Sequence, residues 1–382
     1  MSKSVLFVFH DSNPLSGATT SMLEIVAQLK KNNLYEITAL IPNAKGGLHS
    51  ELSRLGINYL EEKIYNVRYI KKQKNNYINE FKSFIKTTLN YFLSIKLKSA
   101  QFDLVYTNTS DVYVGVYLAK KLNVPHIWHI REFGLEDQNR DHFLGEKRFY
   151  RLVSTSCKVI VISNALKEKL LRFNVPQDRI AMIHNDVANT IGDFCKNYNM
   201  KEQLSLLIVG TITPEKGHQF LFECIKYMDV KGTKVKLSIV GDDTTDYAIN
   251  LKNQIEIEGY TNSICFLGYS NDVNRIRKSY DVAVIASKAE AFGRVTIEAM
   301  HAKMVVVASD CGANPELIKH GENGFLFEEG SVEQFSEIIK NLNDNREILY
   351  EVGKKAHKFA EQFSKKQAAA KVDKIICEAL DS

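Results

Sequence analysis

The chain lacks the signals of several protein classes. Its six cysteines form no C-x-x-C pair and no Cys/His cluster with zinc spacing, which argues against a zinc site and fits a reducing cytosol. No apolar run reaches the ~18–20 residues of a membrane-spanning helix, and the first residues lack the apolar core and cleavage site of a signal peptide. We therefore expect a cytoplasmic protein, with peripheral contact to the inner face of the cell membrane as an option.

The net charge is also small for the length. A formal charge of +5 on 382 residues does not favour binding of nucleic acid by the whole protein. The hydrophobic share of 45% and the charged share of 25% are ordinary for a globular protein, so the chain can bury a large core. Its length predicts two domains.

Short apolar runs alternate with segments of helical spacing along the whole chain. The first run covers residues 4–9, and the same series begins again at residue 204. Runs that are apolar at every position suit strands buried on both faces of a parallel sheet. The alternation with helices therefore predicts an open parallel α/β sheet in each half.

A polar stretch separates the two halves. Residues 190–203 are rich in Asn and Lys and show no clear periodicity. We therefore expect an N-terminal domain at 1–190, a linker at 191–203 and a C-terminal domain at 204–360. Residues 361–382 are expected to form a C-terminal helix that can pack back on the first domain.

The stretch 289–316 carries the clearest candidate site. Glu290 and Glu298 are separated by seven residues, and Gly293 lies between them, just before a segment of helical spacing. A helix that starts at a glycine loop offers N–H groups and a positive dipole end to a phosphate. An ionised carboxylate accepts hydrogen bonds from sugar hydroxyls. Acidic residues near a helix start are also common for a simpler reason, since they complement the helix dipole.

Three further residues lie near the carboxyl ends of predicted strands, where a parallel sheet places its ligand groups. Gly17 follows the first strand, Lys216 lies in the glycine loop 210–217, and His129 is near the end of the strand 126–130. Lys216 can meet a diphosphate as a point charge. Each residue has an ordinary alternative: a tight turn for the glycine, an exposed loop lysine, and a structural histidine.

Residues 61–100 differ in composition from the rest of the chain. They hold nine Lys or Arg against three Glu, and aromatic and aliphatic residues are interleaved with these charges. One interpretation is a surface that faces an anionic membrane. The other is an ordinary amphipathic helix whose apolar face packs on the sheet and whose charges are solvated.

Taken in order, these motifs resemble the GT-B glycosyltransferases of family 4. In the second half they are the loop 210–217, Gly241-Asp242, Gly268, the Glu290/Glu298 pair and the segment 309–316. In the first half they are Ser16-Gly17-Ala18, W-H-I-R-E at 128–132, V-I-S-N-A-L at 161–166 and His184-Asn185-Asp186-Val187. The resemblance covers almost the whole chain. It implies an α/β fold of two Rossmann-like domains, with parallel sheets that face a central cleft, a nucleotide-sugar donor on the second domain and the acceptor on the first.

The resemblance also implies a role for each matching residue. Glu290 would contact the hydroxyls of the donor sugar, Glu298 would bind the ribose, and His129 would hydrogen-bond the transferred sugar near the reacting carbon. Lys216 and Gly17 would approach the diphosphate. The remaining donor-binding positions are Thr211, and Phe292, Gly293, Arg294 and Val295 through their backbone N–H groups. Leu267, Gly268 and Tyr269 would contact the base.

Enzymes of this family typically retain the anomeric configuration and need no catalytic metal. The resemblance thus implies no cofactor beyond the nucleotide-sugar co-substrate, which we expect to be a UDP-sugar. A front-face displacement and a double displacement through a carboxylate both remain open. One departure stands out, because Thr211 occupies the position where the family usually has an arginine. The loss of that cation is expected to cost ~1.5–3 kcal/mol of donor binding unless Arg294 replaces it.

Three functions follow from these observations. The first is a retaining glycosyltransferase that acts on a glycan or lipid-linked acceptor in capsule, O-antigen or exopolysaccharide biosynthesis. The second is a sugar-nucleotide epimerase of the same fold, which would convert the donor without an acceptor. The third is a non-catalytic partner subunit, which the missing arginine supports.

Overall fold

The computed structural model describes residues 2–72, 75–192, 194–196, 198 and 203–381 in two compact units. The N-terminal unit comprises Met1–Asp186 together with Lys366–Ser382, and the C-terminal unit comprises Val187–Lys365. The expected linker at 191–203 lies partly outside the described residues, at 193, 197 and 199–202, and its described part groups with the C-terminal unit.

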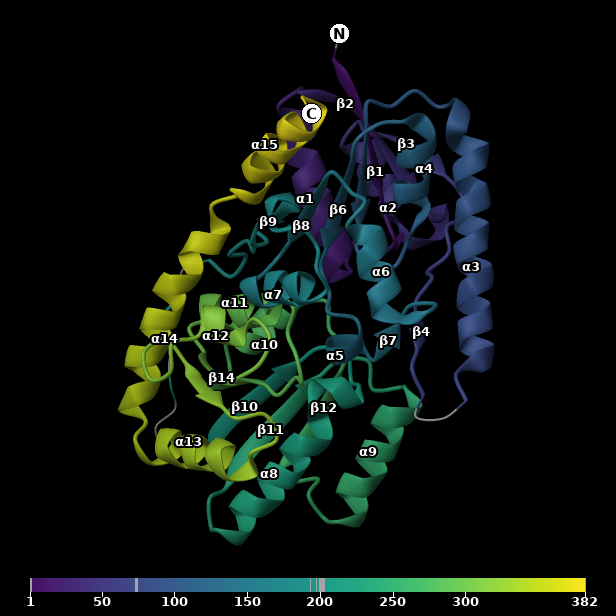
Figure 1. Cartoon of the computed structure of the whole chain (residues 1–382). Coiled ribbons are helices and arrows are strands. Elements are labelled where there is room, and N and C mark those ends of the chain that lie inside the picture. The colour runs from purple at the N-terminus through teal and green to yellow at the C-terminus, as the bar shows by residue number, and fades with distance from the viewer. Residues whose placement is uncertain (1, 73–74, 193, 197, 199–202, 382) are drawn as a thin grey trace. The chain divides into compact units, whose positions relative to one another are not determined.

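Among the described residues, the N-terminal unit contains a seven-stranded parallel sheet in the order β3-β2-β1-β5-β6-β8-β9 (Figure 1). Its strands are β1 (Lys3–Val8), β2 (Tyr35–Ile41), β3 (Asn58–Glu61), β5 (Leu104–Asn108), β6 (His126–Ile130), β8 (Lys158–Val161) and β9 (Ile180–Met182). The chain runs outward from β1 to β3 and then returns to the other side of β1, so the direction of winding switches between β1 and β5. Open α/β sheets bind ligands at such a switch point.

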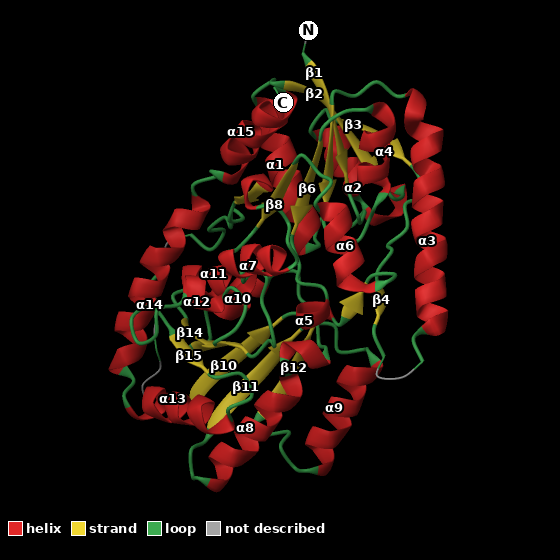
Figure 2. Ribbon diagram, in the orientation of Figure 1, coloured by secondary structure: helices red, strands yellow, loops and turns green. Residues whose placement is uncertain are grey.

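Helices cover both faces of this sheet (Figure 2). They are α1 (Gly17–Lys31), α2 (Leu48–Arg54), α3 (Tyr77–Lys96), α4 (Val114–Leu122), α5 (Leu135–Gln138), α6 (Gly145–Val153), α7 (Asn164–Arg172) and α15 (Ala368–Leu380). The last of these returns from the C-terminal unit, and its Val372 and Ile376 join the core formed with Val5 and Ile25. Figure 1 shows α15 beside α1. Short 3-10 turns occur at Ala44–Gly46, Leu97–Ser99 and Gln177–Arg179.

Helix α3 buries a mostly polar face and exposes large apolar side chains, which is the reverse of an ordinary surface helix. Its buried residues are mostly polar, namely Ser83, Asn90, Leu93 and Ser94. The Asn90 side chain accepts from Tyr65 N at 3.1 Å and donates to Tyr65 O at 2.9 Å, so it anchors the helix to the preceding loop. Large apolar side chains on the same helix are exposed, including Tyr77 at 81% and Phe81 at 62%. The interpretation in which the apolar face of this helix packs on the sheet is therefore wrong.

Two short strands lie beside α3. They are β4 (Tyr69–Ile70) and β7 (Arg140–Asp141), and they pair antiparallel to each other. Figure 2 shows β4 of this small ribbon beside α3.

Among the described residues, the C-terminal unit contains a six-stranded parallel sheet in the order β12-β11-β10-β13-β14-β15. Its strands are β10 (Leu204–Val209), β11 (Val235–Val240), β12 (Ile264–Gly268), β13 (Val282–Ile285), β14 (Val305–Ser309) and β15 (Phe325–Phe327). Here the winding switches between β10 and β13. The two parallel α/β sheets predicted from the alternating pattern are thus confirmed.

The helices of the C-terminal unit flank its sheet. They are α8 (His218–Val230), α9 (Asp246–Ile257), α10 (Val273–Arg277), α11 (Arg294–His301), α12 (Asn314–Leu317), α13 (Val332–Asp344) and α14 (Glu347–Ala360), with 3-10 turns at Pro214–Lys216 and Glu361–Ser364. Apolar side chains of β10, β11, α8 and α13 form one core cluster. No helix within the described residues of the chain has the length and apolarity to cross a bilayer.

Candidate active site

Two loops meet at the switch point of the C-terminal sheet. One follows β10 and carries Lys216, and the other follows β13 and carries Glu290. They are joined by a backbone hydrogen bond of 2.9 Å from Lys288 N to Glu215 O. Gly217 has φ +77°, and a Cβ there would lie 2.1 Å from Ala286 O, so the loops approach this closely only because residue 217 is glycine.

Lys216 and Glu290 form an ion pair across these loops. Lys216 Nζ lies 2.6 Å from Glu290 Oε1, and the Ser287 hydroxyl donates to the same oxygen at 2.7 Å. The Glu290 side chain is 11% exposed and the Lys216 side chain 26%. Within the described residues Glu290 Oε2 accepts no hydrogen bond, so it remains an acceptor for a ligand hydroxyl.

The turn after β14 fixes the backbone of Glu290. Ala313 N donates to Glu290 O at 2.7 Å. Gly312 has φ +58°, and a Cβ at this position would lie 2.4 Å from Glu290 O and 2.6 Å from Glu290 N. The segment 309–316, which the sequence marked as a motif, thus holds the candidate acid in place through a turn that accepts only glycine.

Helix α11 begins directly after this loop and is directed at the same switch point. Gly293 caps the helix with φ +89°, and the first hydrogen bond of the helix runs from Ile297 N to Gly293 O at 3.2 Å. The N–H groups of the first turn are therefore not used within the helix. Together with the helix dipole they favour an anion at this end.

Glu298 lies on the second turn of α11 between two arginines. Arg277 Nη2 contacts its Oε2 at 2.6 Å, and Arg294 Nε lies 3.5 Å from its Oε1. The Arg277 side chain is only 4% exposed and also donates to Asn274 Oδ1 at 2.8 Å. These contacts orient the carboxylate and leave one net positive charge on the group of three side chains.

Three predicted glycines meet at the carboxyl ends of β10, β11 and β12. Gly241 N donates to Gly268 O at 3.1 Å, and a Cβ on Gly241 would lie 2.1 Å from Gly210 O. Thr211, which follows Gly210, is exposed. Leu267 and Tyr269 are exposed at 41% and 68%, at the end of the edge strand β12.

In the N-terminal unit, the side chain of His129 takes part in a buried hydrogen-bond network. Tyr106 Oη lies 2.6 Å from His129 Nδ1, and Arg131 Nη2 lies 3.1 Å from the same atom. Because arginine can only donate, Nδ1 is an acceptor and the neutral ring carries its proton on Nε2. Burial, with the charge of Arg131, holds the pKa of His129 well below its usual range.

Nε2 of His129 is the unused end of this network. It is buried and has no hydrogen-bond partner among the described residues. Arg131 is itself fixed by Asn108 Oδ1 at 2.6 Å and Asn185 Oδ1 at 2.5 Å. The network therefore presents a single N–H donor near the carboxyl end of β6. Gly17, at the first position of α1, has open space where a Cβ would be.

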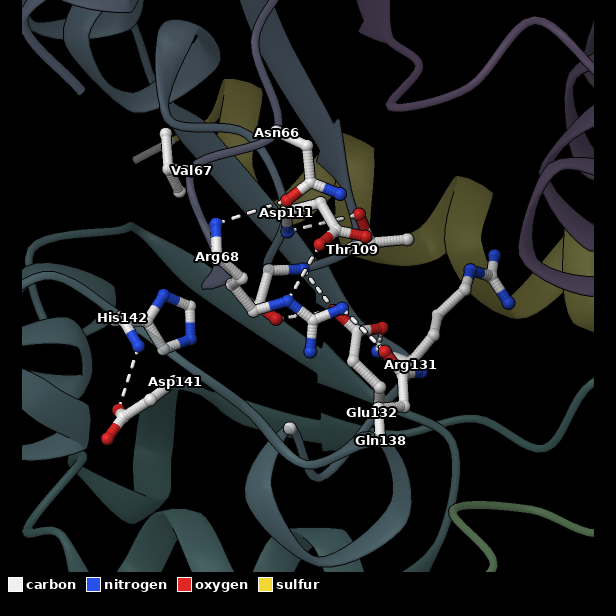
Figure 3. Close-up of polar contacts among 12 residues, drawn as sticks. Asn66, Val67, Arg68, Thr109, Asp111, Arg131, Glu132, Gln138, Asp141 and His142 are labelled. Carbon is white, nitrogen blue, oxygen red and sulfur yellow. Dashed lines mark hydrogen bonds and ion pairs between the residues drawn. The ribbon is translucent and has the colours of Figure 1, made fainter. Parts of the chain in front are cut away.

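A second buried network follows β5 and β6 (Figure 3). Arg68 Nε donates to Asp111 Oδ1 at 2.7 Å, and its Nη2 donates to Gln138 Oε1 at 2.8 Å and lies 3.9 Å from Glu132. Burial alone would raise the pKa of Asp111, but the guanidinium of Arg68 holds it well below its usual range. The network ties the loop before β4 to the loops of the main sheet.

Two family profiles match the chain and together cover most of it. The profile of "Glycosyltransferase Family 4" matches residues 15–188, and that of "Glycosyl transferases group 1" matches residues 194–366. This chain belongs to the GT-B glycosyltransferases of family 4.

Relatives and solved structures agree with the family. An uncharacterised glycosyltransferase of Methanocaldococcus jannaschii is 34% identical over 44% of this chain, a match that spans only 46% of that relative. The UDP-Gal:alpha-D-GlcNAc-diphosphoundecaprenol alpha-1,3-galactosyltransferase of Escherichia coli is 24% identical over 65% of this chain and 68% of its own length. The crystal structure of Anabaena HepE in complex with UDP and glucose superposes with a TM-score of 0.74, 20% identity and full coverage of both chains.

The GT-B fold therefore brings together some of the predicted residues. Lys216 meets Glu290, and Gly293, Arg294 and Glu298 share the start of α11. Leu267, Gly268 and Tyr269 lie at the far edge of the same sheet, and His129 and Gly17 belong to the other unit.

Sequence reasoning missed the roles of four residues: Arg277 and Ser287 beside the candidate residues of the C-terminal unit, and Arg131 and Tyr106 beside His129 in the N-terminal unit. Arg131 was within a recognised motif, and Arg277 lies on a short helix whose basic face is visible in the sequence. The other two had no sequence signal, because a buried hydroxyl shows its role only through its partner.

Proposed function

We propose that this chain is a retaining glycosyltransferase that moves a sugar from a UDP-sugar to a glycan or lipid-linked acceptor in surface polysaccharide assembly. The observation that carries the proposal is the Lys216–Glu290 pair at the switch point of the C-terminal sheet, next to the N-terminus of α11. A cation, a carboxylate with one unused oxygen and first-turn N–H groups that make no bond within the helix suit a diphosphate attached to a sugar.

The donor roles follow from what each group offers. Lys216 and the first-turn N–H groups of α11 would hold the diphosphate, with Gly17 and Thr211 at its edge. Glu290 Oε2 would accept from the sugar hydroxyls, and Glu298, held by Arg277, would accept from the ribose. Arg277 and Arg294 add positive charge next to Glu298. We propose that this charge compensates in part for the arginine that the family usually has at the position of Thr211.

The uridine base is proposed from the relatives. The Escherichia coli relative is named for UDP-Gal, and the Anabaena protein was solved with UDP. In this chain, Leu267, Gly268 and Tyr269 at the end of β12 are the proposed base contacts, since the exposed Tyr269 ring offers a stacking surface.

The chemistry we propose is electrostatic. As the bond between the sugar and the diphosphate breaks, negative charge develops on the leaving phosphate and positive charge on the sugar. Lys216 and the N–H groups of α11 stabilise the first charge where it forms. We propose that they do so without a catalytic metal. A front-face attack, in which the leaving phosphate takes the proton of the acceptor, uses these groups directly.

His129 is proposed to act on the transferred sugar. Its Nε2–H is a fixed donor because Tyr106 and Arg131 occupy Nδ1. A neutral histidine can donate to a sugar hydroxyl without placing a second cation next to the positively charged sugar of the transition state. This role requires both units to contribute to one reaction.

The exposed residues of helix α3 favour contact between the N-terminal unit and a membrane. Its exposed apolar residues are Tyr77, Ile78, Phe81, Phe84, Ile85, Leu89, Tyr91 and Phe92. Most of them lie on the face opposite the buried Ser83 and Asn90, while Phe84 and Tyr91 lie at its side and pack against Phe143 and Tyr117. The surrounding segment has six more basic than acidic residues. We propose that this face contacts an anionic membrane, from which a lipid-linked acceptor would be presented.

Product analysis tests the proposed activity. Purified protein would be incubated with UDP-glucose, UDP-galactose or UDP-N-acetylglucosamine, with and without bacterial lipid extract. Transfer of label to the lipid fraction, lost in Glu290→Gln and kept in Glu329→Gln on the exposed segment after β15, is the expected result. Conversion of the sugar nucleotide with no lipid present would identify an epimerase instead. The absence of any turnover or UDP binding would favour a non-catalytic partner.

A further inference from the structure

A basic hollow lies between α3 and the β4–β7 ribbon of the N-terminal unit. Its volume is about 450 Å³, within the size range of small-ligand sites. Lys72 and Arg140 line it from the ribbon side, Lys82 and Lys86 from α3, and Arg68 also contributes to the wall. None of the described residues that line it is Asp or Glu.

Four of these cations make no close ion pair. Lys72, Lys82, Lys86 and Arg140 make no ion pair within 4 Å with any carboxylate in the described parts of the chain. Other lysines of the same segment are paired, since Lys71 contacts Asp141 at 3.1 Å and Lys96 contacts Glu62 at 2.6 Å. Three lysines of the segment that make no ion pair, Lys72, Lys82 and Lys86, therefore line the hollow together with Arg140.

The fifth cation is neutralised but not fully hydrogen-bonded. Asp111 and Glu132 offset the charge of Arg68, which is buried. Its Nη1 has no hydrogen-bond partner among the described residues (Figure 3). The Arg68 network fixes the ribbon side of the hollow, while the four unpaired cations supply its charge.

Four like charges around one hollow repel each other, and a multivalent anion relieves that repulsion. A diphosphate fits this better than a carboxylate because it carries more charge and more acceptor oxygens. The hollow also borders the exposed apolar face of α3, where Phe81 precedes Lys82 and Ile85 precedes Lys86. A ligand held there has an anionic group and an apolar chain.

We infer that this hollow binds the diphosphate of a lipid-linked acceptor, with the lipid chain along the exposed face of α3. The inference rests on the proposed function, because it names the acceptor class of that reaction. The hollow and the donor groups around Lys216 lie in different units of the chain, so the two can be tested separately.

The test is a titration with geranyl diphosphate, a short lipid diphosphate, in the presence of saturating UDP so that donor-site binding is blocked. Wild type would be compared with Lys82→Gln/Lys86→Gln. The matched control is Lys63→Gln/Lys98→Gln, which removes the same charge from exposed lysines of the same segment that do not line the hollow. Loss of two charge-assisted contacts should weaken binding at least about tenfold in the first variant only.

Equal affinities in all three proteins, or equal losses in both variants, would overturn the assignment. Vesicles of phosphatidylcholine with phosphatidylglycerol distinguish a lipid headgroup from a diphosphate. If Lys82 and Lys86 matter for the vesicles but not for geranyl diphosphate, the hollow is a bilayer contact and the inference is wrong. A separate measurement of UDP affinity tests the proposed donor site. If UDP does not bind, the proposed function is in error, but the comparison of the variants for geranyl diphosphate still tests the hollow.

Discussion

Lys216 Nζ lies 2.6 Å from Glu290 Oε1, so the cation proposed for the diphosphate and the carboxylate proposed for the sugar are bonded to each other. The pair is close to electrically neutral, and Ser287 donates to the same carboxylate oxygen. A donor that takes up Lys216 through its phosphate and Glu290 through its hydroxyls would compete with this ion pair. Under the proposed function, donor binding would replace this contact with contacts to the phosphate and to the sugar hydroxyls.

Gly312→Ala should abolish most turnover through Glu290. The new Cβ would lie 2.4 Å from Glu290 O, so the loop that carries the carboxylate must move. Gly330→Ala is the matched control, because Gly330 also has a positive φ, +81°, but open space around it. In both variants the positive φ should cost about 1 kcal/mol of the free energy of unfolding. Only Gly312→Ala should also lose turnover. Equal activity in the two variants, measured by label transfer, would contradict the role of this turn.

Arg277→Gln should weaken donor binding more than it lowers turnover at saturation. The substitution removes the 2.6 Å contact that orients Glu298. We expect the donor KM to rise about tenfold, as for one lost charge-assisted hydrogen bond, and Arg277→Lys to restore part of it. Arg275→Gln, on the exposed side of the same short helix, serves as the control. An unchanged donor KM in Arg277→Gln would contradict the proposed role of Glu298 in donor binding.

How far the sequence predicted this molecule depends on the kind of interaction. The strands were predictable because runs such as that of β10 are apolar at every position, and the glycines near Lys216 and Glu290 marked the loops. The ion pair of Arg277 with Glu298 could not be predicted, because the two residues are 21 positions apart and meet only when α10 lies beside α11.

The orientation of α3 was the clearest failure. Its spacing shows an amphipathic helix but not which face is buried, and the apolar face would ordinarily be chosen. Ser83 and Asn90 are buried instead because their side chains bond the backbone of Val67 and Tyr65. Those partners lie in a preceding loop that has no regular pattern.

Buried histidines should make the N-terminal unit less stable in acid. Burial lowers the pKa of His126 to about 3 and holds those of His129 and His142 well below the usual 6.5. The folded state therefore keeps them neutral, while the unfolded state takes up protons below pH ~6.5. Their stabilising contribution is complete above that pH and is lost as the pH falls, by up to about 1.4 kcal/mol per pH unit for each histidine.

Urea unfolding at pH 7.5 and 5.5 measures this effect. The free energy of unfolding should fall less between the two pH values in His126→Gln than in wild type. His320→Gln, at an exposed position, should fall as much as wild type. The same fall in all three proteins would contradict the assignment to buried histidines.

The exposed face of α3 should bind anionic membranes. Phe81→Ser/Phe92→Ser removes two of its apolar side chains, at 62% and 59% exposure, and should lower binding to phosphatidylglycerol vesicles by at least about tenfold. Binding of wild type should also weaken as salt screens the basic segment. Sedimentation with vesicles measures both effects. Binding that is equal for neutral vesicles and independent of salt would contradict a role for this face.

The most direct test of the donor site is a calorimetric titration of UDP into wild type, Lys216→Gln and Lys288→Gln. Lys288 is exposed and lies two residues before Glu290, so it matches the charge change without the ion pair. The account predicts that wild type and Lys288→Gln bind UDP alike and that Lys216→Gln binds about 10- to 100-fold more weakly. Equal affinity in all three proteins would show that Lys216 does not meet the diphosphate and would contradict the proposed site.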